Sequence, residues 1–470
     1  MASAGDKEDS VLKMRAESET RSFLRRAFAS ALLALVLAGS GVPQAAFAGT
    51  AFPIVETTLP NGLRVIIQED RRFPVAALQV WYRVGSRNET PGLTGISHLL
   101  EHMMFKGTAR YGPKAFSRIV AENGGRENAM TSRDFTMYFT QLAPDRLPLV
   151  LELEADRMRN LLLDPEELQR EREVVKEERR SHTDDDPQGA FMEEFQGIVY
   201  AAHPYRLPTV GWMADIASIQ RADLLEYYRT YYAPNNALLV IVGDVSAQEV
   251  LPRVRELFGS LPPGPLPPRM RAVEPPQRGE RRLIMRREVQ FPSFLIAFHV
   301  PNLTQREGFA LEVLRAALAD GRSARWVRDF VYRRQVALEV DVHYDALSLD
   351  PGLFTLSATA SPGGKVEALE VELLADLERV RAEGISELEL RRAQDRLEAR
   401  TILRQDSAFA QGMLLGQYEL LGGWRLRDEY VPGIRAVTAE DIRRVASRYL
   451  IPDNRTVGLL LPVTSREERQ

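Results

Sequence analysis

Hydrophobic and polar residues alternate along this chain in two different periods, and their order predicts an α+β protein. Apolar residues two apart indicate strands, whereas apolar residues three and four apart indicate amphipathic helices. In the first half, strands are expected at residues 63–67, 75–82 and 237–242, and residues 128–141 are expected to be extended. Helices are expected at residues 114–122, 144–161, 164–180 and 249–258.

The second half of the chain repeats this order of elements. Strands are expected at residues 283–289, 293–300, 336–344 and 352–360. Helices are expected at residues 307–319, 324–334, 365–383 and 386–404. Two halves with the same succession of strands and helices suggest an internal duplication.

A short residue pattern supports the duplication, because it occurs twice at one separation. Three pairs of identical residues lie 218 positions apart: Asp223 and Asp441, Tyr231 and Tyr449, and Pro234 and Pro452. Each triplet spans a helix and a Tyr-x-x-Pro-x-Asn turn that leads into an apolar strand. The alternative is a coincidence between two helix–turn–strand units. Duplication predicts two homologous domains, each with a mostly antiparallel sheet and helices packed on it.

A proline-rich stretch separates the two halves. Residues 261–268 contain five prolines, a composition typical of a semi-rigid linker. We therefore expect a first domain at residues 49–260, a linker at 261–275 and a second domain at 276–470.

The first 48 residues are predicted to be a signal peptide. Arg25 and Arg26 precede an apolar run at residues 27–38, and Ala46-Phe47-Ala48 fits a cleavage site after Ala48. The run is short for a membrane span, although an uncleaved anchor is the alternative. Translation from Met14 and twin-arginine export are also open. We expect export to a bacterial periplasm, with no stable membrane span after cleavage.

Composition narrows the possible chemistry. The chain has 470 residues, a net charge of −4 and no cysteine. The lack of a basic excess argues against a nucleic-acid partner. Without cysteine there are no disulfides and no thiolate ligands, so any metal site must use histidines and carboxylates.

The segment around His98, Glu101 and His102 is the strongest candidate for chemistry. It reads H-x-x-E-H, and apolar residues at helical spacing surround it. Histidines four apart share one helix face and can bind one Zn²⁺ ion, while the glutamate can accept a proton from water. This is the inverzincin order of the zinc-peptidase triplet. The alternative is a buried amphipathic helix with two incidental histidines.

A catalytic zinc usually has a third protein ligand. Four glutamates on one predicted helix are candidates: Glu171, Glu173, Glu177 and Glu178. Glu171 and Glu178 lie two helical turns apart on one face, so one could bind metal while the other supports the site. Acids on a charged helix are more often a solvated face, and spacing does not choose among the four.

These motifs resemble the pitrilysin–insulysin–mitochondrial processing peptidase family of inverted zinc metallopeptidases, in particular its small bacterial two-domain members. The match covers the H-x-x-E-H motif with its flank up to Thr108, and a downstream E-x6-E block, over nearly all of the mature chain. The resemblance implies a processing-peptidase-like fold. It also implies that Glu178 is the third zinc ligand and that Glu171 is a supporting catalytic-site carboxylate.

The resemblance also implies how a substrate is held and cut. Residues 124–131 resemble the family's substrate-binding edge strand, which makes Asn128, Ala129 and Thr131 candidate substrate-binding residues. The expected activity is that of a zinc endopeptidase in which Glu101 is the general base, without a covalent intermediate.

The second half departs from the family pattern. Members that are complete in one chain carry an Arg and a Tyr seven residues apart, and the matching positions here are Val331 and Leu338, or Tyr332 and Glu339 if the alignment shifts by one. We therefore expect the zinc-bearing subunit of a heterodimer, whose homologous partner supplies the Arg/Tyr pair. The alternative is a misaligned segment in a monomer or homodimer.

The sequence fits other functional classes less well. A non-catalytic scaffold subunit is the main alternative, but that class should have a damaged zinc triplet. The cysteines of the zinc deaminase signature are absent. His182, His203, His299 and His343 have no spacing that suggests a second metal, so we interpret them as structural.

Overall fold

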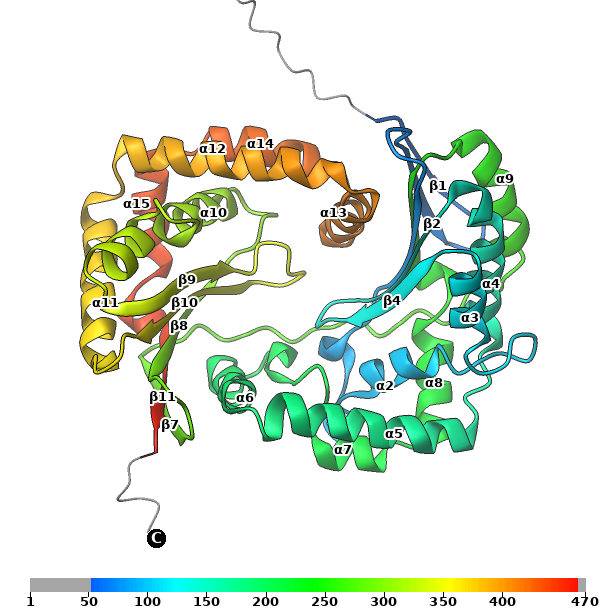
Figure 1. The fold of residues 1–470 in the computed structure, drawn as a ribbon, viewed down its shortest axis with the longest axis horizontal. Coiled ribbons are helices and arrows are strands. Elements are labelled where there is room, and N and C mark those ends of the chain that lie inside the picture. Colours follow the sequence, from blue (N-terminus) through cyan, green and yellow to red (C-terminus); the bar gives the residue numbers. More distant parts are fainter. Residues whose placement is uncertain (1–51, 464–470) are drawn as a thin grey trace, which may run out of the picture. The chain divides into compact units, whose positions relative to one another are not determined.

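Two β-sheets, one in each half of the sequence, organise residues 52–463, the part of the chain described in this computed structural model (Figure 1). The first sheet has the order β1-β2-β6-β3-β5-β4. Its strands are β1 (Ile54–Thr58), β2 (Arg64–Glu69), β3 (Ala76–Tyr82), β4 (Arg126–Thr131), β5 (Thr136–Leu142) and β6 (Ala237–Gly243). Only β2 and β6 pair in parallel, so the expected mostly antiparallel sheet is confirmed.

The helices of the first half follow the expected order. They are α2 (Ile96–Met103), α3 (Ala115–Glu122), α4 (Leu147–Asn160), α5 (Pro165–Arg179), α6 (Pro187–Val199), α7 (Met213–Ser218), α8 (Arg221–Tyr231) and α9 (Ala247–Phe258). Residues 128–141 are largely extended as expected, in β4 and β5, but a turn divides them. The Ser132 hydroxyl accepts hydrogen bonds from the backbone of Asp134 and Phe135 and closes this turn.

The second sheet has the order β7-β11-β8-β10-β9. Its strands are β7 (Arg281–Arg287), β8 (Ser293–Val300), β9 (Ala337–Tyr344), β10 (Gly352–Ala360) and β11 (Arg455–Pro462). The helices are α10 (Arg306–Ala319), α11 (Val366–Glu383), α12 (Glu387–Leu403), α13 (Ala408–Leu421), α14 (Leu426–Arg435) and α15 (Ala439–Tyr449). Much of the helix expected at 324–334 is a π-helical segment, η6 (Val327–Arg333).

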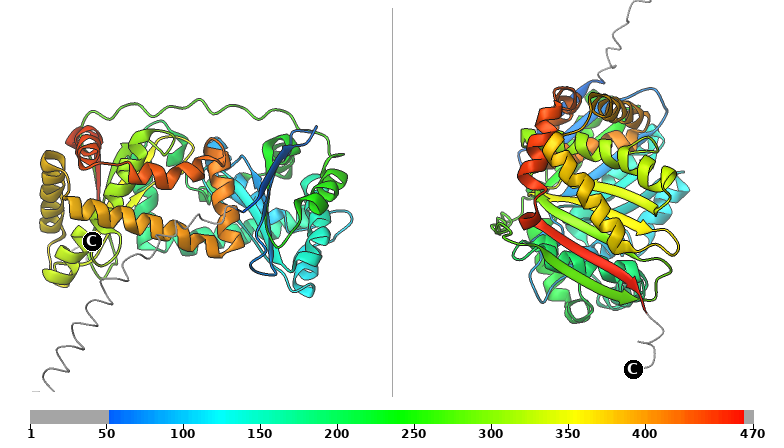
Figure 2. Two further views of the ribbon diagram at one scale, coloured as in Figure 1. Left: turned by 90° about the horizontal axis from the view of Figure 1, so that it is seen from above. Right: turned by 90° about the vertical axis from the view of Figure 1, so that its left-hand side faces the viewer.

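The duplication is confirmed by topology. Helices α8 and α15 begin and end 218 residues apart, and the order β2-β6-β3-β5-β4 matches β7-β11-β8-β10-β9 strand for strand. The parallel pair also recurs, as β2 with β6 and as β7 with β11. Residues 262–278 between the two halves hold no helix or strand and run as an extended chain (Figure 2, left). We propose the domain boundary there.

Each sheet is covered on one face by a helix from the other half of the sequence. Leu415 of α13 packs in one apolar cluster with Trp81 and Leu238 of the first sheet. Phe195 of α6 packs in another cluster with Leu295 of the second sheet. Strands buried on both faces need apolar residues at every position, which explains the uninterrupted run of β6. Residues 53–463 therefore belong to one compact unit.

The described helices include no candidate for a membrane span. None of those within residues 52–463 combines the length and the apolar character that a bilayer requires.

Candidate metal centre

Helix α2 presents its motif residues on one face because its other face is anchored in the core. Leu99, Leu100 and Met103 are buried in the main cluster of the first half. Gly95 caps the helix with φ +85°, and a Cβ there would lie 2.4 Å from the Val210 carbonyl oxygen, so glycine is required.

Two buried contacts fix the start of α2. The Glu89 carboxylate accepts hydrogen bonds from the backbone N–H groups of Gly95 (2.8 Å) and Ser97 (2.9 Å). Burial raises the pKa of Glu89 to about 7, although these two donors oppose the rise. The Ser97 and Tyr227 hydroxyls lie 2.7 Å apart. The residue before His98 is therefore held by two other segments.

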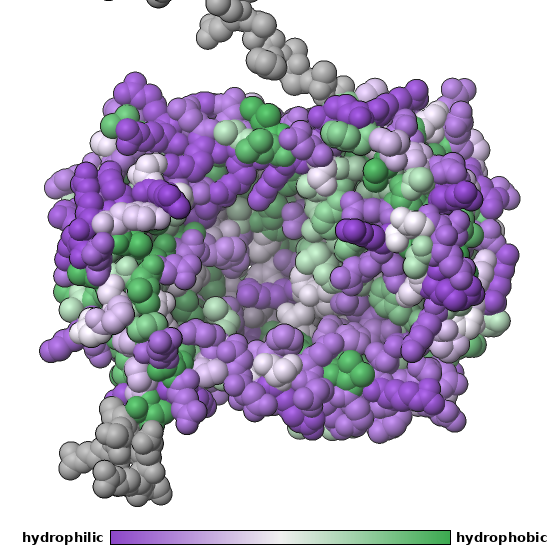
Figure 3. All heavy atoms as spheres, viewed as in Figure 1, coloured by the Kyte–Doolittle hydropathy of each residue, from purple (hydrophilic) through white to green (hydrophobic). Residues whose placement is uncertain are grey.

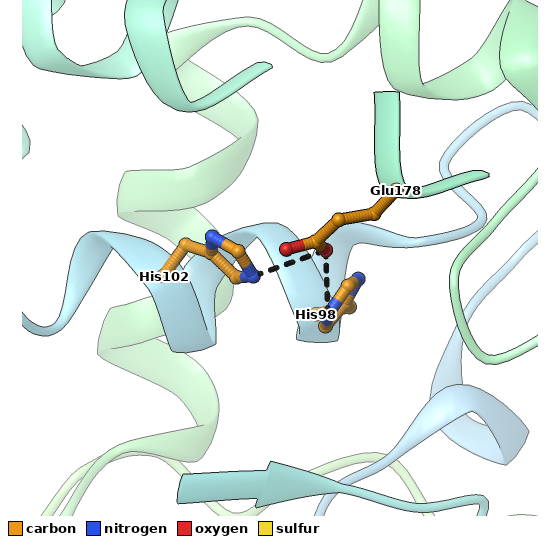
Figure 4. Close-up of side chains that lie close together, drawn as sticks. All are labelled: His98, His102 and Glu178. Carbon is orange, nitrogen blue, oxygen red and sulfur yellow. Dashed lines mark ion pairs between the residues drawn. The ribbon is translucent and has the colours of Figure 1, made fainter. Parts of the chain in front are cut away.

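His98, His102 and Glu178 converge at one point, as Figure 4 shows. The Nε2 atoms of His98 and His102 lie 3.6 Å and 3.5 Å from Oε2 of Glu178. Nitrogen and oxygen ligands about 2.0–2.1 Å from a tetrahedral zinc ion lie about 3.3 Å from one another. The three side chains thus fit a zinc ion in both donor type and spacing. No other such group occurs among residues 52–463.

Glu171 supports this cluster from behind. Its Oε2 lies 3.1 Å from Nδ1 of His102, and its Oε1 lies 2.6 Å from Nζ of Lys106. Burial alone would raise the pKa of Glu171, but the hydrogen bonds from His102 and Lys106 outweigh it and lower the pKa. An ionised Glu171 keeps the proton of His102 on Nδ1 and leaves Nε2 free to bind a metal.

The two histidines differ in their electrostatics. Burial and the neighbouring His102 lower the pKa of His98 to about 4, so its imidazole is neutral at pH 7. Burial pulls the pKa of His102 down, but the hydrogen bond to Glu171 and the Glu178 and Glu101 carboxylates outweigh burial and raise it. A divalent cation between them is compatible with both rings in the neutral form.

Glu101 lies beside this cluster and contacts Thr131. The Thr131 hydroxyl donates a hydrogen bond to Oε2 of Glu101. Burial raises the pKa of Glu101, and the Thr131 hydrogen bond opposes that rise. A carboxylate with a raised pKa is a stronger base than an exposed one.

The predicted substrate-binding residues lie on β4, which is an edge of the first sheet. Among residues 52–463, strand β4 pairs with β5 alone. Asn128 is exposed, Ala129 packs on the core, and Thr131 turns its hydroxyl to Glu101. The outer backbone groups of β4 are therefore available to an extended peptide, whereas the Thr131 side chain serves Glu101.

Three contacts of the site were not foreseen from the sequence: those of Lys106, of Glu89, and of the Thr131 hydroxyl with Glu101. Lys106 follows His102 by four residues but lies beyond the end of α2 at Met103, so helical spacing does not reveal its contact. Glu89 and Thr131 come from segments whose approach depends on the tertiary fold, so no local pattern announces them.

The second half has no counterpart of this cluster. At the offset of 218, the positions of His98, His102 and Glu178 are held by Ala316, Asp320 and Arg396. The Arg396 guanidinium donates to the Ala316 carbonyl at 3.2 Å and to the Asp320 carbonyl.

Three of the remaining histidines have structural contacts. His203 lies 3.1 Å from Asp350, His299 lies 2.9 Å from the Val199 carbonyl, and His343 lies 3.1 Å from Asp345.

Each half of the sequence matches the model of a known protein family. Residues 64–211 match "Insulinase (Peptidase family M16)" and residues 218–397 match "Peptidase M16 inactive domain". The "Zinc protease PqqE" of Helicobacter pylori is 33% identical over 414 residues, which is 86% of this chain and 92% of that protein. The chain belongs to peptidase family M16. This bears out the resemblance to the pitrilysin–insulysin–mitochondrial processing peptidase family.

A solved structure and another relative are also similar to this chain. The crystal structure of a protease from Helicobacter pylori superposes with a TM-score of 0.84 at 32% identity, covering 87% of this chain and all of that one. A probable mitochondrial-processing peptidase subunit beta of Arabidopsis thaliana is 26% identical, covering 87% of this chain and 78% of that protein. The two-domain α+β fold is thus that of the M16 family.

Proposed function

We propose that this chain is a zinc-dependent endopeptidase and that Glu101 is its general base. The observation that carries the proposal is the convergence of His98, His102 and Glu178 at zinc-binding distances, with Glu101 beside them. The names of the relatives, which are zinc proteases, support the same chemistry.

Each residue has a defined task in this proposal. Zinc bound by the two histidines and Glu178 supplies a Lewis acid that acidifies water and polarises the scissile carbonyl. Glu101 accepts a proton from the attacking water and passes it to the leaving amine. Glu171 orients His102, and Lys106 keeps Glu171 in place.

The substrate is proposed to be a peptide or an unfolded segment in extended form. It would add a strand to β4 beside Asn128 and Ala129, with main-chain hydrogen bonds setting its register. The backbone of Thr131, at the end of β4, would pair with the same peptide, while its side-chain hydroxyl holds Glu101. Because every peptide has the same backbone groups, this pairing fixes the position of the chain rather than its sequence.

The test is Glu101→Gln, with zinc content and peptide cleavage measured on the same preparation. Glutamine keeps the size of the side chain and touches none of the three ligands, so bound zinc should stay at the wild-type level. Cleavage should fall about 10³-fold, because a general base contributes about 10²–10⁴-fold. Equal cleavage by the two proteins would exclude Glu101 as the base. Zinc binding without cleavage by either protein, alone or with a partner, would favour a non-catalytic subunit.

We propose that the active enzyme is a heterodimer in which a homologous subunit supplies an Arg/Tyr pair. The family positions hold Val331 in η6 and Leu338, 45% exposed, on β9. The match of the second half to an inactive domain, and a relative named as a subunit, support this view. The purified chain should gain at least tenfold in kcat/KM when the homologous protein from its genetic neighbourhood is added. Full activity of the lone chain would refute the heterodimer.

The proposed location is the periplasm. The signal peptide at residues 1–48 lies outside the described residues, so its evidence is the sequence pattern. Amino-terminal sequencing of the protein from its native cells should begin at Gly49. An amino terminus at Met1 or Met14 would contradict cleavage after Ala48.

A further inference from the structure

A cavity of about 680 Å³ begins where the edge strand β4 ends. Met130 and Ser132 line it from the first half, and Tyr344 and Tyr418 line it from the second half. The surface is hollowed between the two halves in Figure 3. Thr131, between Met130 and Ser132, contacts Glu101, so the cavity adjoins the proposed catalytic site. A peptide paired with β4 would continue into this cavity.

The charged groups that line the cavity are mostly arginines. They are Arg133, Arg315, Arg400, Arg404 and Arg427, together with the acids Asp134, Glu312 and Asp345 and with His343.

All three acids already have partners. Asp134 pairs with Arg87 at 3.0 Å, and Glu312 pairs with Arg315 at 2.9 Å. Asp345 lies 3.1 Å from His343. The charge of Arg133 also helps to lower the pKa of Asp345, although no ion pair at salt-bridge distance joins the two among the described residues.

Two of the arginines have no carboxylate partner. Among the ion pairs of residues 52–463, none includes Arg133 or Arg404. The Arg133 guanidinium carbon lies 5.5 Å from the centroid of the Tyr205 ring. Arg133 belongs to the turn after β4, and Arg404 follows the end of α12, so they come from different halves of the sequence. Arg400 pairs with Asp320, which is not part of the lining.

We propose that this cavity binds a carboxylate of the peptide substrate, and that Arg133 and Arg404 recognise it. The inference rests on the proposed peptidase function. Guanidinium groups bind carboxylates through two parallel hydrogen bonds, which makes them specific as well as strong. The enzyme would prefer peptides with aspartate or glutamate in the segment beyond β4, or with a free carboxyl terminus placed there.

The experiment compares three peptides of one sequence: an acidic form, a form with Asn and Gln in place of the acids, and the acidic form with an amidated carboxyl terminus. The acidic form should have about tenfold higher kcat/KM than the form that lacks the recognised carboxylate, as expected for a hydrogen bond between charged groups. A loss of activity only on amidation would assign the carboxylate to the chain terminus. Loss only with Asn and Gln would assign it to the side chains.

The variants are Arg404→Gln and Arg404→Glu, with Arg269→Gln as the matched control. Arg404 and Arg269 are both exposed, and Arg269 lies in the linker away from the cavity lining. Arg404→Gln should reduce the acidic preference about tenfold, and Arg404→Glu should shift it toward Lys-containing peptides. Arg269→Gln should leave it unchanged. Arg133→Gln should act like Arg404→Gln.

A binding measurement distinguishes failure of this inference from failure of the peptidase proposal. In Glu101→Gln, a fluorescent acidic peptide should bind about tenfold more tightly than its neutral form, and added salt should weaken the difference. Cleavage that neither the Asn/Gln replacement nor amidation weakens, or a carboxylate preference that persists in Arg404→Glu, would overturn the inference and leave the peptidase intact. Absence of cleavage together with acidic binding would overturn only the peptidase proposal.

Discussion

Lys106, Glu171 and His102 form a chain of contacts behind the proposed metal site, and this chain should control zinc affinity. Glu171→Gln removes the negative charge that His102 and Lys106 contact, so we expect zinc affinity to fall about 10–100-fold while the fold is kept. Lys106→Met should act in the same direction with a smaller effect. Zinc transfer to a chromogenic chelator measures both changes.

A neighbouring glutamate provides the control for this prediction. Glu173 lies on the same helix but is exposed and pairs with Lys176. Glu173→Gln should keep wild-type zinc affinity. If Glu171→Gln also kept it, the contact with His102 would have no role in metal binding.

The sequence could predict the part of the site that lies on one helix. His98, Glu101 and His102 are related by helical spacing, and a helix fixes their directions. Spacing on α5 left four glutamates open, because only the crossing of α2 and α5 decides which one faces the histidines. That crossing brings Glu178 to both Nε2 atoms and Glu171 to the opposite side of His102. Contacts between segments far apart in sequence, such as Thr131 with Glu101, have no periodic signature.

At the scale of elements, the start of α12 depends on one carboxylate with several partners. Glu389 accepts from the Ser386 hydroxyl at 2.7 Å and from Nη2 of Arg325 at 2.7 Å. Burial opposes its ionisation, but these donors outweigh burial and lower the pKa of Glu389 to about 2. Because this value lies below the usual 4.5, the contribution of Glu389 to stability is complete above about pH 4.5 and is lost as the pH falls toward 2.

Glu389→Gln should therefore lower stability at pH 7 more than at pH 3. We expect a loss of about 1–2 kcal/mol at pH 7, allowing for solvent screening of a partly exposed pair, and little difference near pH 2. Urea unfolding at pH 7 and pH 3 measures the change. Glu387→Gln, on the exposed side of the same helix start, should have no such pH dependence. A Glu389→Gln deficit that stayed constant with pH would contradict the assignment.

The sequence predicted helices and strands where the apolar period was regular. It did not predict the turns that side-chain contacts close. Residues 128–141 were expected to be extended and lie in β4 and β5, but the turn that the Ser132 hydroxyl closes between these strands was not predicted. Strand β6 gave an uninterrupted apolar run, which sequence alone could identify as buried on both faces. It could not identify what covers the second face, because that helix, α13, comes from the other half.

At the scale of the whole molecule, the duplication has diverged so that, among residues 52–463, the His98–His102–Glu178 cluster occurs in the first half and has no counterpart in the second. Arg396 stands at the position equivalent to Glu178, and its guanidinium bonds the carbonyl groups of Ala316 and Asp320, the positions equivalent to the two histidines. A fixed organic cation thus links the two helices in the second half, where a zinc ion is proposed to link α2 and α5 in the first. Glu171 has kept its carboxylate as Glu389, which now pairs with Arg325.

The exchange of helices between the halves also makes the two sheets depend on each other, and Gly416 tests this dependence. A Cβ on Gly416 of α13 would lie 2.3 Å from the indole of Trp81 on β3, so Gly416→Ala must push α13 away from the first sheet. Overpacking of this kind costs about 1–3 kcal/mol.

Gly197 of α6 is the matched control, because a Cβ there meets no atom within 4 Å. Gly197→Ala should stabilise the protein by about 0.5–1 kcal/mol, since alanine is the better helix former. Thermal unfolding followed by tryptophan fluorescence should give a lower Tm for Gly416→Ala and a slightly higher one for Gly197→Ala. Helix α13 also carries Tyr418 of the cavity wall, so Gly416→Ala should weaken binding of the acidic peptide while zinc content stays unchanged. Equal Tm values for the two variants would mean that α13 does not hold the halves together.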